Sequence, residues 1–286
     1  MITLDELNHM NAEELFRNIR KKKSFLCVGL DTDYQKIPRI LLDCEYPVFE
    51  FNKHIIDATV DMAVAFKLNL AFYEGMGAAG YMSLEMTINH IRDHYPEIFI
   101  IADAKRGDIG NTSQMYANAY LKTLDCDAIT LSPYMGRDSI DPFLNVEGKW
   151  AVILALTSNK GSADFQQLEL KDGKRLFEKV ITSTMAWGSV NNIMYVIGAT
   201  RADALGEVRQ LIPEHFLLVP GVGSQGGDLK EVSSKGMNDR CGILVNSSRA
   251  ILYADVTNRF EQAAREEAKR LQNEMNILLD QKGLTG

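Results

Sequence analysis

Eight short apolar runs, separated by polar and amphipathic stretches, constrain the fold of this chain more than any other feature. They cover residues 25–30, 63–68, 98–103, 128–131, 151–156, 193–198, 216–221 and 242–247. Short buried strands that alternate with helices indicate a parallel α/β fold. Eight such units without an evident linker favour a closed barrel over an open, doubly wound sheet. We therefore predict a single (β/α)8 TIM barrel that occupies residues 1–286 as one domain.

The length and composition of the chain fit one barrel of this kind. Its 286 residues, 46% of them hydrophobic, are enough for a single large core. A net charge of -7 argues against a general nucleic-acid-binding or anionic-membrane surface. No apolar run approaches the roughly 18 residues of a membrane span, and the N-terminus lacks the apolar core of a signal peptide. Instead, Leu15, Phe16 and Ile19 share one side of an amphipathic pattern, which predicts an extra N-terminal helix.

The cysteines and histidines restrict the chemistry that we expect. The four cysteines are scattered, without a C-x-x-C pair, which is typical of a reducing compartment. We therefore expect a cytoplasmic protein without disulfides or structural zinc. None of the five histidines directly follows an apolar run, which argues against histidine catalysis and against a histidine-based metal site.

The segment IFIIADAKRGDIGNT, residues 98–112, carries the densest array of charged groups. An apolar run without charges fits a strand buried on both faces, and it leads directly into Asp103, Lys105 and Asp108. We expect these three groups in the loop after the strand, where barrel enzymes keep catalytic groups. An acid, a base and a second acid this close together favour chemistry over a solvated turn.

Two further charged groups lie at the ends of neighbouring runs. Lys67 lies in an otherwise apolar run, where a lysine costs several kcal/mol unless it is paired. Asp31 follows the first run and Asp103 the third, so both carboxylates could reach it. The sequence thus predicts alternating charges, in the order Asp31, Lys67, Asp103, Lys105 and Asp108.

The segments after the last two runs predict a phosphate site. A glycine-rich stretch extends from Pro220 to Asp228, and its backbone N–H groups could surround an anion. After the eighth run, residues 246–250 read NSSRA, which resembles a helix N-terminus with the guanidinium of Arg249 added. The loops after the seventh and eighth strands are the usual phosphate site of such barrels.

Taken in order, the motifs DAKRGDIGNT, PGVGSQGGD and NSSRAILYA resemble the orotidine 5'-phosphate decarboxylase family. The segments GLDTD, AFKLNLAFYE, LSPYMGRDSIDPF and LTSNKG are similar to its longer bacterial branch. The resemblance implies a TIM barrel that converts orotidine 5'-phosphate to UMP and CO2, the last step of de novo pyrimidine nucleotide synthesis. It also implies a homodimer that needs neither a metal nor a cofactor and binds no nucleic acid and no membrane.

The resemblance assigns the catalytic roles residue by residue. Lys105 would be the general acid that delivers a proton to C6 of the pyrimidine, and Asp103 would lie beside the departing carboxylate. Lys67 would bridge the two aspartates and, with Asp31, bind the ribose hydroxyls. These assignments agree with the chemistry, because loss of CO2 leaves a carbanion that a fixed ammonium group stabilises and then protonates.

The resemblance also implies the binding residues. Asp108 and Thr112 would reach across the dimer interface into the partner's site, Ile109 would line the pocket beside the base, and Ser158 would hydrogen-bond the pyrimidine edge. One position departs from the family pattern, because Lys160 stands where we expect a proline. This difference affects the stiffness of the loop over the base and not the chemistry. The remaining substrate-binding residues are Pro220, Gln225, the Ser248 backbone and Arg249.

Three alternatives compete with this assignment. The related 3-keto-L-gulonate 6-phosphate decarboxylase uses Mg²⁺, which a glutamate after the second strand helps to bind. Here that position is Lys67, which would repel a cation. A Schiff-base aldolase on Lys105 is a second alternative, but its lysine is usually desolvated or beside another cation, and flanking aspartates favour a protonated lysine. A non-catalytic barrel that binds phosphosugars is the third.

Overall fold

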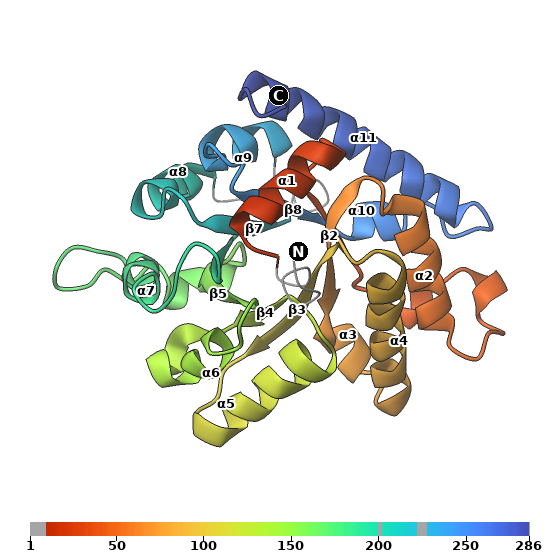
Figure 1. Cartoon of the computed structure of the whole chain (residues 1–286), viewed down its shortest axis with the longest axis horizontal. Helices are drawn as coiled ribbons and strands as arrows, with labels where there is room; N and C mark the ends of the chain where they lie inside the picture. The colour runs from red at the N-terminus through yellow and green to blue at the C-terminus, as the bar shows by residue number, and fades with distance from the viewer. Residues whose placement is uncertain (1–9, 200–201, 222–227, 286) are drawn as a thin grey trace, which may run out of the picture.

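The strands form a closed barrel, as the spacing of the apolar runs predicts. The computed structural model describes residues 10–199, 202–221 and 228–285. Within these ranges, eight parallel strands pair in chain order, and β8 pairs with β1 to close the ring (Figure 1). The predicted (β/α)8 barrel is therefore confirmed. The strands are β1 (Leu26–Gly29), β2 (Ala63–Asn69), β3 (Phe99–Arg106), β4 (Ala128–Leu131), β5 (Trp150–Leu156), β6 (Ile193–Ile197), β7 (Phe216–Pro220) and β8 (Ile243–Ser247).

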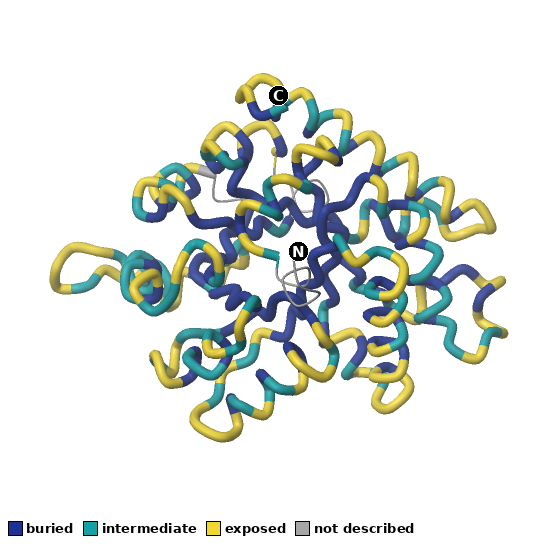
Figure 2. Tube along the Cα trace, in the orientation of Figure 1, coloured by how far each residue is buried: buried dark blue, intermediate teal, exposed yellow. Residues whose placement is uncertain are grey.

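The strands are buried on both faces, which explains why they are apolar without alternation. Figure 2 shows the buried segments gathered in the ring of strands and the exposed ones on the outer helices and loops. One boundary differs from the prediction. β3 continues to Arg106, whose carbonyl accepts a hydrogen bond from Ser132 N at 2.7 Å. Asp103 and Lys105 therefore lie within the strand itself and not in the loop after it.

Helices surround the barrel and follow the strands in the expected alternation (Figure 1). A π-helical turn, Asn118–Thr123, continues α5. The longest helix, α11, corresponds to the amphipathic stretch near the C-terminus. The described α-helices are α1 (Ala12–Lys22), α2 (Pro47–Thr59), α3 (Leu70–Glu74), α4 (Ala78–His94), α5 (Gly110–Ala117), α6 (Asp141–Leu144), α7 (Leu176–Thr184), α8 (Ala202–Leu211), α9 (Leu229–Gly236), α10 (Arg249–Leu252) and α11 (Phe260–Gln281).

The extra N-terminal helix is also confirmed, and it covers the end of the barrel at which the strands begin. Asn11 and Glu14 form a capping box at the start of α1, and Leu15 and Ile19 are fully buried. The indole of Trp150, the first residue of β5, donates to the Met10 carbonyl at 2.7 Å. Further hydrogen bonds join α1 to residues just before other strands, namely Val60, Glu97 and Asn191. The opposite end, where the strands finish, therefore stays open for ligands.

His215, just ahead of β7, is a buried histidine without a hydrogen-bond partner for either ring nitrogen among the described residues. Its ring packs edge-on against Tyr195 at 5.6 Å between centroids. Burial, and then the nearby Arg209 guanidinium, lower the pKa of His215 to about 4. The folded state thus holds this ring neutral at pH values where an unfolded chain protonates it.

We predict that this histidine makes the fold less stable in mild acid. With an unfolded pKa near 6.5, the unfolded chain binds the extra proton first as pH falls, so the free energy of unfolding decreases between about pH 6.5 and pH 4, by at most about 3 kcal/mol. Urea denaturation at pH 7 and pH 4.5 measures this loss. His215→Phe, which keeps a ring beside Tyr195, should lose clearly less stability over the same interval; an unchanged slope would assign the effect to other groups.

Candidate active site

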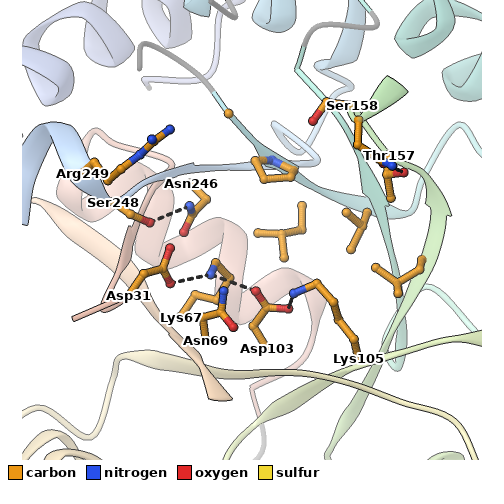
Figure 3. Close-up of a pocket in the computed structure, with 16 residues that line it drawn as sticks. Asp31, Lys67, Asn69, Asp103, Lys105, Thr157, Ser158, Asn246, Ser248 and Arg249 are labelled. Atoms are coloured by element: carbon orange, nitrogen blue, oxygen red, sulfur yellow. Dashed lines mark hydrogen bonds and ion pairs between the residues drawn. The ribbon is translucent and has the colours of Figure 1, made fainter. Parts of the chain in front are cut away.

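The open end of the barrel holds a cavity of about 330 Å³ (Figure 3). Its wall is made at the carboxyl ends of the strands, where barrel enzymes place their catalytic groups. Charged and polar side chains occupy the side formed by β1, β2, β3 and β8, and apolar side chains of β5, β6 and β7 face them. The lining residues are Asp31, Lys67, Asn69, Asp103, Lys105, Leu154, Thr157, Ser158, Asn159, Val196, Leu218, Pro220, Gly221, Asn246, Ser248 and Arg249.

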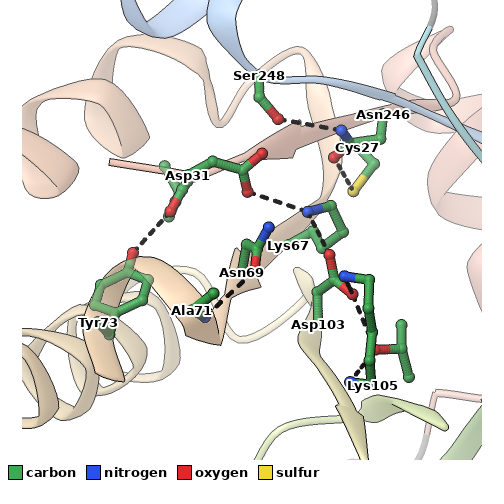
Figure 4. Close-up of polar contacts among 12 residues, drawn as sticks. Cys27, Asp31, Lys67, Asn69, Ala71, Tyr73, Asp103, Lys105, Asn246 and Ser248 are labelled. Atoms are coloured by element: carbon green, nitrogen blue, oxygen red, sulfur yellow. Dashed lines mark hydrogen bonds and ion pairs between the residues drawn. The ribbon is translucent and has the colours of Figure 1, made fainter. Parts of the chain in front are cut away.

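Four of the predicted charged groups form one continuous row in this cavity (Figure 4). Lys67 Nζ lies 3.1 Å from Asp31 Oδ1 and 3.0 Å from Asp103 Oδ2. Lys105 Nζ lies 2.6 Å from the other oxygen of Asp103. Charges of opposite sign therefore alternate from β1 to β3, as the sequence predicts for Asp31, Lys67, Asp103 and Lys105.

The row fixes the charge state of its central members. Burial by itself opposes the charged form of Asp103, but Lys67 and Lys105 outweigh it and lower the pKa of Asp103 to about 2. Burial likewise opposes a charged Lys67, yet Asp103 and Asp31 raise the pKa of this lysine above its ordinary value. At neutral pH, Asp103 is thus a carboxylate and Lys67 an ammonium group, although both are buried.

Two tyrosines, the buried Tyr73 and the partly buried Tyr253, position the backbone just after β1. The Tyr73 hydroxyl donates to the Leu30 carbonyl at 2.9 Å, and the Tyr253 hydroxyl donates to the Asp31 carbonyl at 3.2 Å. The backbone around Asp31 is held from two sides, so its carboxylate stays directed at Lys67.

The ends of β1 and β8 meet closely in the region predicted to hold phosphate. A Cβ atom on Gly29 would lie 1.9 Å from Ser248 Oγ and 2.9 Å from Asn246 Oδ1, so a side chain at position 29 would fit only if these two side chains moved. Asn246 Nδ2 in turn donates to Ser248 Oγ at 3.1 Å. Arg249 is exposed at the start of α10, which is only four residues long. Positive charge at this end of the cavity therefore comes from the guanidinium more than from a helix.

The loop after β5 forms the wall opposite the charged row. Ser158 packs against Gly198, where a Cβ atom would lie 2.7 Å from Ser158 N. Gln166 Oε1 accepts from Thr157 N at 2.8 Å and ties the loop to residues further along it. Lys160, the departure from the family pattern, begins a short 3-10 turn, Lys160–Asp164. The turn thus forms without the expected proline.

Three predicted residues do not line the cavity of their own chain. Asp108 accepts from Ile109 N at 2.8 Å, and the side chain of Ile109 is 52% exposed. Thr112, in the first turn of α5, is exposed as well. The prediction that Ile109 lines the pocket therefore finds no support within a single chain. Gln225 lies outside the described residues.

Several residues that line the cavity were not predicted from the sequence. Asn69 and Asn246 lie at strand ends. The rule that predicted Asp31, that polar residues at the ends of apolar runs line the site, could therefore have predicted them too. Asn69 also caps α3 by accepting from Ala71 N at 3.3 Å. The apolar lining residues are hidden in continuous apolar runs, because such runs do not show which side chains point inward. They are Leu154, Val196 and Leu218.

The described part of the chain, residues 10–199, 202–221 and 228–285, shows neither a cluster of metal ligands nor a membrane-spanning helix. It contains no group of three or more His, Cys, Asp or Glu side chains arranged to hold a metal ion. In the same residues, no helix is long and apolar enough to cross a membrane.

The fold and the site define the class of this protein. A closed (β/α)8 barrel with a row of acids and lysines at the carboxyl ends of its strands is a TIM-barrel enzyme. The model of the orotidine 5'-phosphate decarboxylase / HUMPS family matches residues 24–266, which is most of the barrel. The chain belongs to this family, and the resemblance stated from its motifs is confirmed.

Individual relatives agree with the family match over nearly the whole chain. The chain is 57% identical to the orotidine 5'-phosphate decarboxylase of Phocaeicola vulgatus, over 95% of this chain and 100% of the relative. It is 53% identical to the enzyme of that name from Flavobacterium johnsoniae, over 96% and 100%. Among solved structures, the OMP decarboxylase of Leishmania donovani superimposes with a TM-score of 0.81 and 37% identity, covering 94% of this chain and 99% of that one.

Proposed function

We propose that this chain decarboxylates orotidine 5'-phosphate to UMP and CO2, the last step of de novo pyrimidine nucleotide synthesis. The observation that carries the proposal is the row Asp31–Lys67–Asp103–Lys105 at one side of a cavity whose other end holds Arg249. The relatives that match the chain over nearly its whole length bear this activity in their names. The whole chain, residues 1–286, acts as one domain, and the reaction takes place in the cytoplasm.

The substrate lies along the cavity with its phosphate near Arg249 and the Ser248 backbone, together with Gln225 and Pro220. Asp31 and Lys67 bind the ribose hydroxyls at the polar side. Ser158, on the opposite wall, hydrogen-bonds the edge of the pyrimidine. The phosphate lies far from the reacting carbon, so its binding energy can hold the reacting group in place and exclude water.

In the reaction, the bond between C6 and the carboxylate breaks, and its electron pair stays on C6 as CO2 leaves. Asp103 is ionised because its pKa is about 2, and it faces the substrate carboxylate, so loss of CO2 relieves the repulsion of two like charges. The Lys105 ammonium stabilises the charge that develops on C6 and then transfers a proton to that carbon. The four charged side chains thus supply the electrostatics without a metal or an organic cofactor.

The geometry weighs against the rival enzymes. Lys67 places its ammonium between the two carboxylates that a cation would need, at 3.1 and 3.0 Å. The magnesium-dependent relative is therefore disfavoured. Lys105 is paired with Asp103 at 2.6 Å and its side chain is half exposed, whereas a Schiff-base lysine is usually desolvated or beside another cation.

We propose further that the enzyme is a homodimer in which Asp108 and Thr112 complete the partner's site, with Ile109 beside the base there. Exposed apolar side chains surround these residues: Met115 is 67% exposed, and Tyr134 is 85% exposed. A hydrogen bond of 2.9 Å from Ser113 Oγ to the Ser139 carbonyl joins the two segments that carry them. A second copy of the chain would cover these exposed apolar side chains.

Ultraviolet absorbance of purified protein with orotidine 5'-phosphate, in the presence of EDTA, tests the function. The absorbance should change as UMP accumulates, at the same rate with and without the chelator. Loss of activity in EDTA that Mg²⁺ restores would favour the metal-dependent relative. Borohydride trapping of a covalent adduct would favour the aldolase, and tight UMP binding without turnover a non-catalytic binding protein.

The role of Arg249 gives a prediction that separates phosphate binding from catalysis. Arg249→Ala should weaken UMP binding by about 1.5–3 kcal/mol, or roughly 10- to 150-fold in Kd, because a charged hydrogen-bond partner is lost. Uridine, which lacks the phosphate, should bind the variant and the parent equally. Titration calorimetry measures both ligands, and Arg270→Ala on the exposed face of α11 is the matched control. An equal loss for both ligands would make Arg249 structural.

A further inference from the structure

Lys105 has a backbone conformation that side-chain-bearing residues rarely adopt. Its φ is 50°, in the left-handed region, which costs of order 1 kcal/mol or more for a residue other than glycine. Such a conformation persists only when the surrounding structure holds it in place. The proposed proton donor therefore depends on neighbouring groups for its position.

The strain arises from a bulge in β3. In the pairing with β4, Ala102 lies opposite Ile129, and the next pair joins Arg106 to Leu131. Three residues of β3, from Asp103 to Lys105, thus face one residue of β4, Thr130. Bulges of this kind are common beside active sites, where they redirect a side chain. The bulge removes the regular strand partner of the Lys105 N–H group.

The Thr130 hydroxyl takes the place of that lost partner. Thr130 is buried, at 1% exposure, and its Oγ1 accepts from Lys105 N at 2.9 Å. Asp103 is ionised, so its carboxylate can only accept hydrogen bonds. The Thr130 hydroxyl therefore donates a hydrogen bond to Asp103 Oδ1, also at 2.9 Å. Lys105 Nζ binds this same oxygen at 2.6 Å, as Figure 4 shows. Backbone, hydroxyl, carboxylate and ammonium therefore form a closed ring.

We propose that Thr130 is a positioning residue for the decarboxylation: its hydroxyl holds the strained backbone of Lys105 and orients the Asp103 carboxylate. This inference rests on the proposed function. Thr130 does not line the cavity, so it acts through Lys105 and Asp103 and not by touching the substrate. A second contact restrains the backbone beside Lys105. Arg106, which is paired with Glu74, donates to the Ala104 carbonyl at 3.1 Å.

Two substitutions separate the hydroxyl from the shape of the side chain. Thr130→Val keeps the branched shape, which suits a strand, but removes both hydrogen bonds; Thr130→Ser keeps the hydroxyl. For the valine variant we expect kcat to fall roughly 10- to 100-fold, since a misplacement of about 1 Å can cost this much. KM and the Kd of UMP should change less than about threefold, because the phosphate and ribose groups are intact. The serine variant should recover most of the lost kcat.

The matched control is Thr59→Val, which removes another fully buried threonine hydroxyl, one that bonds only the Ile55 carbonyl within its own helix. This control should keep the parent kcat. A Thr130→Val kcat within twofold of the parent, or a loss that the serine variant shares, would overturn the inference.

A crystal structure of Thr130→Val tests the inference even if the parent enzyme fails to turn over orotidine 5'-phosphate. The expected result is that the Lys105 backbone leaves the left-handed region and that its Nζ moves away from Asp103. An unchanged backbone and an unchanged ion pair would overturn the positioning role. An inactive parent would instead overturn the proposed function alone.

Discussion

Lys105→Ala should lower kcat by roughly 10⁴-fold or more, because in the proposed mechanism this one side chain supplies both the proton and the charge that stabilises the carbanion. Lys105 is the lysine of β3; it lines the cavity, and its side chain is half exposed. The other lysine of the row, Lys67, is held between two carboxylates and cannot take over this position. Steady-state kinetics with orotidine 5'-phosphate measure the loss.

UMP binding should survive this substitution much better than catalysis does. The proposed phosphate-binding residue Arg249 lies at the other end of the cavity, so Kd for UMP should change far less than kcat. Lys179→Ala on α7, outside the cavity lining, is the matched control and should behave as the parent does. A Lys105→Ala variant that keeps a tenth of the parent kcat would show that another group delivers the proton.

Mixed dimers should recover activity that neither parent variant has. If Asp108 serves the neighbouring subunit, homodimers of Lys105→Ala and of Asp108→Ala are both impaired. In a heterodimer, the intact Lys105 of one chain meets the intact Asp108 of the other, while the second site carries both substitutions. Exchange of subunits therefore restores one complete site per heterodimer.

The amount recovered is fixed by symmetry. Random reassociation of equal amounts makes half of the dimers heterodimers, each with one of two sites intact, so roughly a quarter of the parent activity should return. Native mass spectrometry of subunits labelled with different isotopes verifies the exchange. If exchange is complete and activity stays at the level of the homodimers, then Asp108 acts in its own chain. If the chain stays monomeric, the dimer itself is excluded.

The barrel and the charged row could be predicted from sequence because both depend on simple rules. Strands buried on two faces must be continuously apolar, and the residue that follows such a run lies at the mouth of the barrel. Asp31 directly follows its run, and Lys67 and Asp103 lie within the last two residues of theirs, so the sequence places all three side chains at the same end of the barrel.

The fine geometry of β3 could not be predicted in the same way. A bulge depends on how two strands pair. The amino-acid sequence of β3 alone therefore does not show that Lys105 has a positive φ or that Thr130 replaces its strand partner. Nor could the sequence place Asp108, Ile109 and Thr112 in a cavity, because one chain does not bring them there. Their assignment depends on a second subunit and stays a prediction.

The contact between Gly29 and Ser248 has a consequence for redesigning this barrel toward other phosphorylated ligands. A methyl group at position 29 would occupy the space of the Ser248 hydroxyl, which Asn246 also binds. Substitutions at these three positions are therefore non-additive: a larger residue at 29 becomes tolerable only after 248 has been made smaller. A combinatorial library should therefore vary the three positions together, because a library that varies position 29 alone would discard larger residues there that need a smaller residue at 248.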